Sequence, residues 1–427
     1  AAGGCLPRPR SEAAGGGAGG GVPRAYAPSS DALLAIFSDE YAETKAWSSW
    51  GPDGAHLPAF SLWACWYGIY RESTVLAGVY ERSTKEIIAS TVSAANNCNF
   101  CGNGHALCAR ASGKAWSLRS SLVAANEEAV NVTGDDRLAS FLAWARSFRF
   151  PHSPAVQSPP LLLPRDAVEL LGTILQVLYK NAMVKLFVGM HPLPDAAPAA
   201  LRALNKQPRM LAALNRLLAL AFMKDAKSAR PGRMAEVWSA LPTPFHPAGV
   251  ILPDDLRWSA PNGDIADALR FMHAEQERVR TALIPTCVSH AFVGWLNAWG
   301  GAVPDARDDW AAALETEAVV AAGPDAVFLA RFVAVAGVAA EQMPAGGLTE
   351  FRARWAGDDP ELALKSVCSW ASWMTARRVV AWMAAPLAAE PTAAVGVHRA
   401  GSELPAPVSL SAARGMGGHA VDAGELL

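Results

Sequence analysis

Three of the seven cysteines in this chain of 427 residues lie within eleven residues, at Cys98, Cys101 and Cys108, and His105 stands between the last two. Two thiols three residues apart on a helix can close a disulfide after modest adjustment, and a histidine one turn further on can move a thiol proton. The four side chains fall within a sector of roughly 80° around a helix. This spacing indicates a redox pair with a base on the same helix face.

Two neighbouring helices must position these side chains. Ser83 followed by Glu86 predicts a capping box that opens the first helix, with Ser83 as the N-cap. Asn97 is expected to cap the second helix, whose first turn would contain Cys98. A helix N-terminus carries partial positive charge and free N–H groups, which favour a thiolate. Glu86 lies on the first of these helices, from which it could orient the imidazole of His105 or accept its proton.

The order Glu86, eleven residues, then Cys98-x-x-Cys101-x-x-x-His105 with Gly113 shortly after resembles the active-site signature of the alkylhydroperoxidase D-like branch of the carboxymuconolactone decarboxylase superfamily. The resemblance implies an all-α fold, usually oligomeric, that reduces hydroperoxides while two cysteines cycle between dithiol and disulfide. It makes Cys98 and Cys101 the redox pair, and His105 with Glu86 the proton relay.

The resemblance also implies what the protein would work with. The substrate would be a hydroperoxide, and the reductant would be a dithiol protein, either lipoylated or thioredoxin-like. No metal or organic cofactor is expected, and a homo-oligomer is an expected state. Some family members carry a second histidine between the two cysteines, where this chain has Phe100, so the relay is expected to be shorter.

A helical pattern runs through nearly the whole chain between its ends, because Ala, Leu, Met, Arg and Glu dominate and alternating β-branched strands are scarce. The predicted fold class is all-α, an alkylhydroperoxidase D-like helical fold in two related halves. The ends are rich in Gly, Ala and Pro, which predicts disorder. The predicted organisation is a disordered segment at 1–30, a helical domain with the Cys-x-x-Cys motif at 31–195, a helical linker at 196–250, a degenerate second helical domain at 251–385 and a disordered tail at 386–427.

The second half lacks the redox pair. Aligning His290 with His105 leaves Leu283 and Thr286 opposite the two cysteines, and Cys287 stands one residue out of phase. One cysteine cannot run a disulfide cycle. We therefore expect a degenerate copy that packs against the first half, closes an internal interface or shapes a pocket.

Composition excludes several classes of protein. The chain has 37 basic and 39 acidic side chains, a net charge of −2, so no nucleic-acid partner is expected. Hydrophobic residues make up 51%, yet no stretch of about twenty apolar residues escapes a charge or helix breaker, so no membrane partner is expected. No secretory signal pattern is visible, and seven cysteines do not suit a disulfide-stapled secreted framework. A cytoplasmic location is expected.

Three other interpretations stay open beside the leading one, a thiol-dependent hydroperoxide reductase. Zinc binding by the Cys and His cluster would need ligand atoms within about 4 Å of one another, whereas on one helix the cluster spans about 15 Å of axis. A non-enzymatic redox switch, or a helical module that binds a ligand or partner, would form a reversible disulfide without turnover. A carboxymuconolactone decarboxylase-like enzyme would use His105 as a base and would not need the cysteines.

Overall fold

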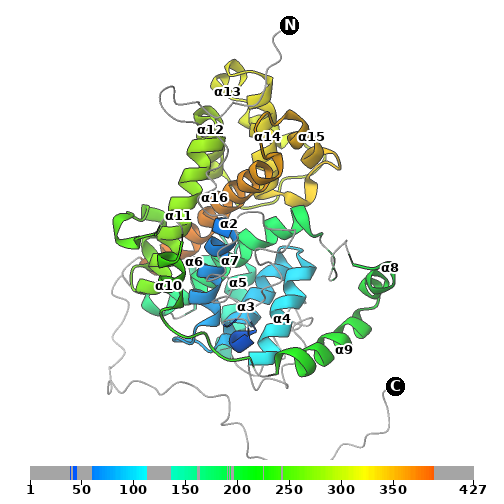
Figure 1. The fold of residues 1–427 in the computed structure, drawn as a ribbon, viewed down its shortest axis with the longest axis vertical. Helices are drawn as coiled ribbons and strands as arrows, with labels where there is room; N and C mark the ends of the chain where they lie inside the picture. Colours follow the sequence, from blue (N-terminus) through cyan, green and yellow to red (C-terminus); the bar gives the residue numbers. More distant parts are fainter. Residues whose placement is uncertain are drawn as a thin grey trace, which may run out of the picture.

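Helices and turns build the whole described part of the protein in the computed structural model (Figure 1). The structure describes residues 60–112, 136–160, 164–189, 197–224, 226–241 and 244–388, together with positions 39, 42–45, 191 and 193. No strand occurs within these ranges, so the predicted all-α class is confirmed. The predicted disordered segments lie outside them, apart from the last helical residues at 386–388.

The helices fall into three consecutive groups along the chain. The first group carries the cysteine motif, the second forms the connection, and the third makes up the C-terminal part. They are α2 (Phe60–Tyr70), the π-helix η2 (Arg71–Val75), α3 (Arg82–Ala95), α4 (Asn99–Ser112), α5 (Asp136–Arg146), α6 (Pro154–Gln157) and α7 (Pro164–Phe187); α8 (Ala199–Arg202), η4 (Ala203–Lys206), α9 (Pro208–Leu218), η5 (Ala219–Met223), α10 (Arg233–Ser239) and η6 (Pro247–Gly249); and η7 (Asp254–Ser259), α11 (Gly263–Leu283), α12 (Thr286–Ala298), η8 (Trp310–Leu314), α13 (Glu317–Ala321), α14 (Pro324–Val338), η9 (Ala340–Gln342), α15 (Gly347–Arg354) and α16 (Pro360–Ala388).

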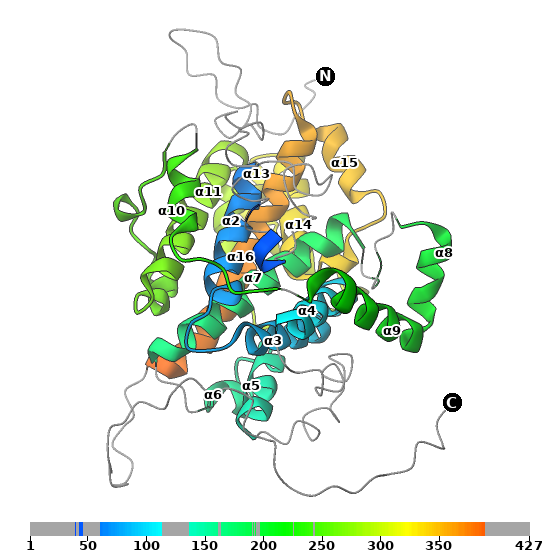
Figure 2. The same cartoon turned by 60° about the horizontal axis from the view of Figure 1, so that its bottom comes forward.

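The hairpin of α3 and α4 presents the cysteine motif. Its turn passes through Asn97, whose φ of 54° lies in the left-handed region that asparagine tolerates better than most residues. The two helices pack closely along their length, and the Ser90 hydroxyl of α3 donates to the Gly102 carbonyl of α4 at 2.9 Å. Figure 2 shows the pair lying side by side. The turn and this hydrogen bond fix the register between Glu86 and His105.

A single apolar core connects the N-terminal and C-terminal helices. The long helices α7 and α16 pack along each other, and α11 packs against both α2 and α16. Large aromatic side chains fill this core, with Trp66, Trp144, Trp370 and Trp373 almost completely buried. Burial of aromatic area on this scale dominates the energetics of a helical core. The motif-bearing hairpin is therefore held by a scaffold drawn from both ends of the described chain.

The C-terminal helices follow one another in an order that parallels the first group. Helices α11 and α12 precede α14 and α16, as α3 and α4 precede α5 and α7, but α11 and α12 do not pack along each other as α3 and α4 do. His290 on α12 is exposed, whereas His105 on α4 is buried. The division into two related halves, with its boundaries, stays a prediction.

The close approach of α14 to α16 at Gly337 generates a test of the core. A Cβ added there would lie 2.8 Å from the Ala371 carbonyl and 3.0 Å from the Phe292 ring, so Gly337→Ala should destabilise the fold by about 1–3 kcal/mol. Gly294→Ala on α12 meets nothing within 4 Å and should stabilise by about 0.5–1 kcal/mol. Urea unfolding of both variants measures the difference. Equal midpoints would contradict the tight packing of α14 on α16.

Candidate functional site

The start of α3 differs from the predicted capping box. Glu81, and not Ser83, occupies the N-cap position, and no side chain caps this helix. The Ser83 hydroxyl is buried without a hydrogen-bond partner among the described residues. The predicted capping box is therefore wrong. The reason is tertiary: the Glu86 carboxylate turns into the core, where other side chains hold it, and is not available to the backbone at the helix start.

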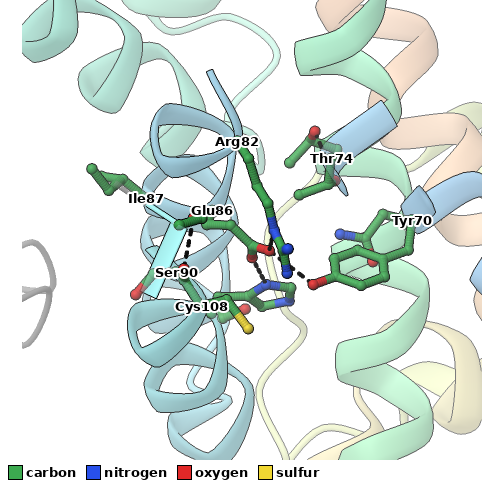
Figure 3. Close-up of polar contacts among 12 residues, drawn as sticks. Tyr70, Thr74, Arg82, Glu86, Ile87, Ser90 and Cys108 are labelled. Carbon is green, nitrogen blue, oxygen red and sulfur yellow. Dashed lines mark hydrogen bonds and ion pairs between the residues drawn. The ribbon is translucent and has the colours of Figure 1, made fainter. Parts of the chain in front are cut away.

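Glu86 is the hub of a buried polar cluster. Its Oε2 lies 2.7 Å from Nδ1 of His105, and its Oε1 accepts hydrogen bonds from the Tyr70 hydroxyl at 2.8 Å and from Nε of Arg82 at 3.2 Å. Figure 3 shows Arg82 and Tyr70 converging on the carboxylate from two helices. Burial alone would raise the pKa of Glu86, but the hydrogen bond from His105, together with the charge of Arg82 and the hydrogen bond from Tyr70, outweighs burial and lowers it. The carboxylate is therefore ionised at neutral pH.

The ionised carboxylate fixes the state of His105. A carboxylate can only accept, so Nδ1 of His105 carries the proton and donates it to Glu86. The pKa of His105 is lowered, first by burial and then by the charge of Lys180, although Glu86 acts in the opposite direction. Its Nε2 is buried with no hydrogen-bond partner among the described residues. His105 is thus a neutral imidazole with a free lone pair on Nε2, the state that a general base requires.

The two cysteines of the motif meet at the start of α4, one residue later than predicted. Because Asn97 adopts the left-handed turn, it does not cap the helix; α4 begins at Asn99 and Cys98 takes the N-cap position. Burial raises the pKa of Cys98, but hydrogen bonds from the thiol and the backbone N–H of Cys101 outweigh burial and lower it. Burial and the neighbouring Cys98 raise the pKa of Cys101. Negative charge in the pair therefore belongs on Cys98, as expected of a thiol at a helix N-terminus.

Two lysines of α7 add positive charge around the dithiol. Lys180 and Lys185 both favour the thiolate of Cys98. Lys185 is nearly buried and pairs with Glu341 of η9 at 2.9 Å, so a C-terminal element holds it in place. A cavity of about 30 Å³ lined by Asn96, Lys185 and Glu341, among others, has room for a water molecule beside the Lys185–Glu341 ion pair.

The structure brings the predicted residues together in two pairs. Glu86 meets His105, and Cys98 meets Cys101, with all four side chains no more than 2% exposed. Across the described residues, no hydrogen bond joins the imidazole to either thiol. Cys108 sits instead with Tyr70 and the carboxylate cluster, where burial and Glu86 raise its pKa to about 12.

Gly113 lies outside the described residues. Within the described ranges no group of three or more His, Cys, Asp and Glu side chains gathers where it could hold a metal ion.

Sequence reasoning missed four residues of the site: Tyr70, Arg82, Lys180 and Lys185. Arg82 carried a usable signal, because it precedes Glu86 by four residues on the same helix, the spacing of an intrahelical ion pair. The other three come from α2 and α7, and only the tertiary packing of those helices on the α3–α4 hairpin places them here.

Comparison with known proteins gives one relative. The chain is 26% identical over 314 residues to the protein named alkyl hydroperoxide reductase Rv2159c from Mycobacterium tuberculosis. The matched region covers 73% of this chain and 80% of the relative. No family model matches the chain. No solved structure matches it either. The similarity favours the alkylhydroperoxidase-like family and a peroxidase-like function at the family level.

The buried neutral state of His105 predicts how stability depends on pH. In the unfolded chain a histidine takes up a proton near pH 6.5. Because the pKa of His105 is lower in the folded chain, the unfolded state binds more protons as the pH falls below that value, and the free energy of unfolding decreases. His105→Gln keeps a donor for Glu86 and removes this titration. Its urea midpoint should fall less between about pH 7 and about pH 5.5 than that of the native chain.

The control for this comparison is His290→Gln, which changes an exposed histidine on α12. It should show the same fall in midpoint as the native chain. A His105→Gln variant that loses as much stability as the native chain over this pH range would contradict the assignment of a buried neutral imidazole.

Proposed function

We propose that this chain is a thiol-dependent hydroperoxide reductase that cycles Cys98 and Cys101 between dithiol and disulfide. The observation that carries the proposal is the state of His105. It is a neutral base on α4, the helix that begins at the dithiol, and the buried carboxylate of Glu86 on α3 holds it in place. The similarity to a protein named alkyl hydroperoxide reductase supports the same class of reaction. An ionisable thiol, a nearby resolving thiol and a base are the groups that such a reaction needs.

The first step is attack of one thiolate on an oxygen of the hydroperoxide. A sulfur–oxygen bond forms and the oxygen–oxygen bond breaks, which leaves a sulfenic acid on the protein and an alkoxide that takes up a proton to become an alcohol. The lowered pKa of Cys98 favours this residue as the holder of the negative charge in the resting dithiol. Either sulfur can then bond to oxygen, because a thiolate at Cys98 can attack directly or take the proton of Cys101.

The second step closes the disulfide. The remaining thiol attacks the sulfenic acid sulfur, the Cys98–Cys101 bond forms, and water leaves. Hydroperoxide and dithiol thus become alcohol, water and disulfide. The i, i+3 spacing keeps the resolving thiol beside the sulfenic acid, and burial of both residues keeps competing thiols away from it.

His105 moves the proton during the first step. Its Nε2 accepts a thiol proton as the thiolate forms and returns it to the leaving alkoxide. The charge that the imidazole carries in between is balanced by Glu86, which Tyr70 and Arg82 hold in place. Because no hydrogen bond joins Nε2 to a thiol in this structure, a water molecule or the substrate itself completes the path.

Renewed activity requires a reductant. A dithiol protein attacks the Cys98–Cys101 disulfide, forms a mixed disulfide, and leaves the protein reduced while it becomes oxidised itself. The proposed partner is a lipoylated or thioredoxin-like protein, which supplies the two electrons and two protons that each turnover consumes.

A second function has one specific observation in its favour. Cys98 is 0% and Cys101 1% exposed, and such burial suits a redox switch that responds slowly better than an enzyme that must admit substrate repeatedly. The switch would form the same disulfide but would show no sustained consumption of hydroperoxide in the presence of a dithiol.

Reaction of the reduced protein with one equivalent of an organic hydroperoxide tests the proposal. The intact mass should fall by about 2 Da as one disulfide forms, and a sulfenic acid reagent should label only one of Cys98→Ser and Cys101→Ser. His105→Gln should react about 100-fold more slowly, the usual cost of losing a general base. Cys287→Ser, which changes a half-buried cysteine outside the site, should react at the native rate.

The other interpretations give different results. A disulfide that dithiothreitol reverses, but that forms too slowly to sustain consumption of hydroperoxide, would identify the switch. Activity on another substrate that survives replacement of both cysteines by serine would identify His105 as the base of a decarboxylase-like enzyme. If Cys98 and Cys101 react with the hydroperoxide no faster than Cys287, a cysteine outside the site, the proposal of a reductase is contradicted.

A further inference from the structure

A basic and apolar arm runs along the outside of the motif helix. The arm comprises residues 199–224, which form α8, η4, α9 and η5. It extends away from the body at α8 and returns to lie against α4 (Figures 1 and 2). Asn215 donates to Asn103 of α4 at 3.1 Å, and Ala219 and Met223 pack on a small apolar cluster with Leu107. One side of the arm is therefore anchored on the helix that carries the dithiol.

The other side of the arm is unusually apolar for a surface. It contributes five of the ten large apolar side chains that are exposed in the described part of the chain. Leu217 is 63% and Phe222 68% exposed, and Leu220 lies between them in sequence. These residues, with Leu201 and Met210, are exposed apolar side chains of the arm that no described element covers. A concentration of exposed apolar side chains on one short segment marks an interaction surface.

The charged residues of the arm are all of one sign. The arm carries five basic residues and no acidic one, whereas the other 401 residues carry 32 basic and 39 acidic side chains. All five basic side chains are exposed: Arg202, Lys206, Arg209, Arg216 and Lys224. The partner that suits the arm must therefore accept apolar side chains and supply negative charge.

A buried arginine beside the arm indicates where that negative charge sits. Arg110 of α4 is only 7% exposed, and neither its Nη1 nor its Nη2 has a hydrogen-bond partner among the described residues. Burial lowers its pKa, and the neighbouring positive charge of Arg216 lowers it further. The two positive charges repel each other, and a group with several acceptor oxygens, such as a phosphate, would relieve this repulsion.

We propose that the arm docks on an anionic lipid surface, with Leu217, Leu220 and Phe222 in the acyl boundary and a headgroup phosphate at Arg110 and Arg216. A lipid surface supplies both the apolar layer and the anions. A second copy joined arm to arm would instead bring like charges together. No described helix is long and apolar enough to cross a membrane, so the arm would lie on the surface.

Sedimentation of the full-length protein with vesicles tests this proposal without any reference to peroxidase activity. The protein should bind vesicles of equal parts phosphatidylglycerol and phosphatidylcholine, and should bind phosphatidylcholine alone at least about 10-fold more weakly. Arg216→Gln should weaken binding about five-fold, and Leu217→Ser combined with Phe222→Ser about 10-fold or more. These side chains are exposed, so the variants should fold.

Matched controls change the same residue types elsewhere. Arg257→Gln alters an arginine side chain that is 70% exposed, and Ile251→Ser alters an isoleucine that is 88% exposed, both far along the chain from the arm. Both should bind anionic vesicles as the native protein does. Failure to bind anionic vesicles, equal binding to phosphatidylcholine alone, or equal losses in the controls would overturn the proposal.

A second copy as the true occupant gives a separate result. In that case native mass would show a dimer without lipid, the arm variants would dissociate it, and vesicles would not compete. Arg110→Gln tests the headgroup site itself, because unchanged binding to anionic vesicles in a folded Arg110→Gln protein would contradict a phosphate at that position.

Discussion

The candidate site depends on a single buried charge, the carboxylate of Glu86. An ionised group with no exposure is costly unless donors surround it, and here His105, Tyr70 and Arg82 supply them from three helices. The charge in turn decides the tautomer of His105 and leaves Nε2 as a base. Removal of the carboxylate would therefore disturb both the chemistry and the packing of α2, α3 and α4, which meet around it.

The rest of the fold positions the dithiol relative to that charge. The turn at Asn97 places Cys98 at the N-terminus of α4, where its sulfur accepts a hydrogen bond from the backbone N–H of Cys101. Helix α7 brings the positive charges of Lys180 and Lys185 near the same sulfur. The C-terminal helices contribute through the shared core and through Glu341, which pairs with Lys185. Their part in the site is therefore electrostatic and structural, although they present no redox pair of their own.

The sequence predicted the fold class and the Glu86–His105 pair because both follow from short-range spacing. It misplaced both helix starts for one reason: local capping rules assume that a side chain serves the nearest backbone, whereas Glu86 serves a tertiary cluster and Asn97 makes the turn. Tyr70 could not be predicted, since only packing of α2 on α3 brings it to Glu86. The arm escaped notice because a net charge of −2 averages over a basic segment and an acidic remainder.

Nitrogen NMR of the His105 ring tests the central claim most directly, with the His105→Gln variant to assign its signals. At neutral pH the account predicts a proton on Nδ1 and none on Nε2, and a loss of this preference in Glu86→Gln, where an amide replaces the carboxylate. A proton on Nε2, or on both nitrogens, would leave His105 without a free lone pair to act as a base and would contradict the account.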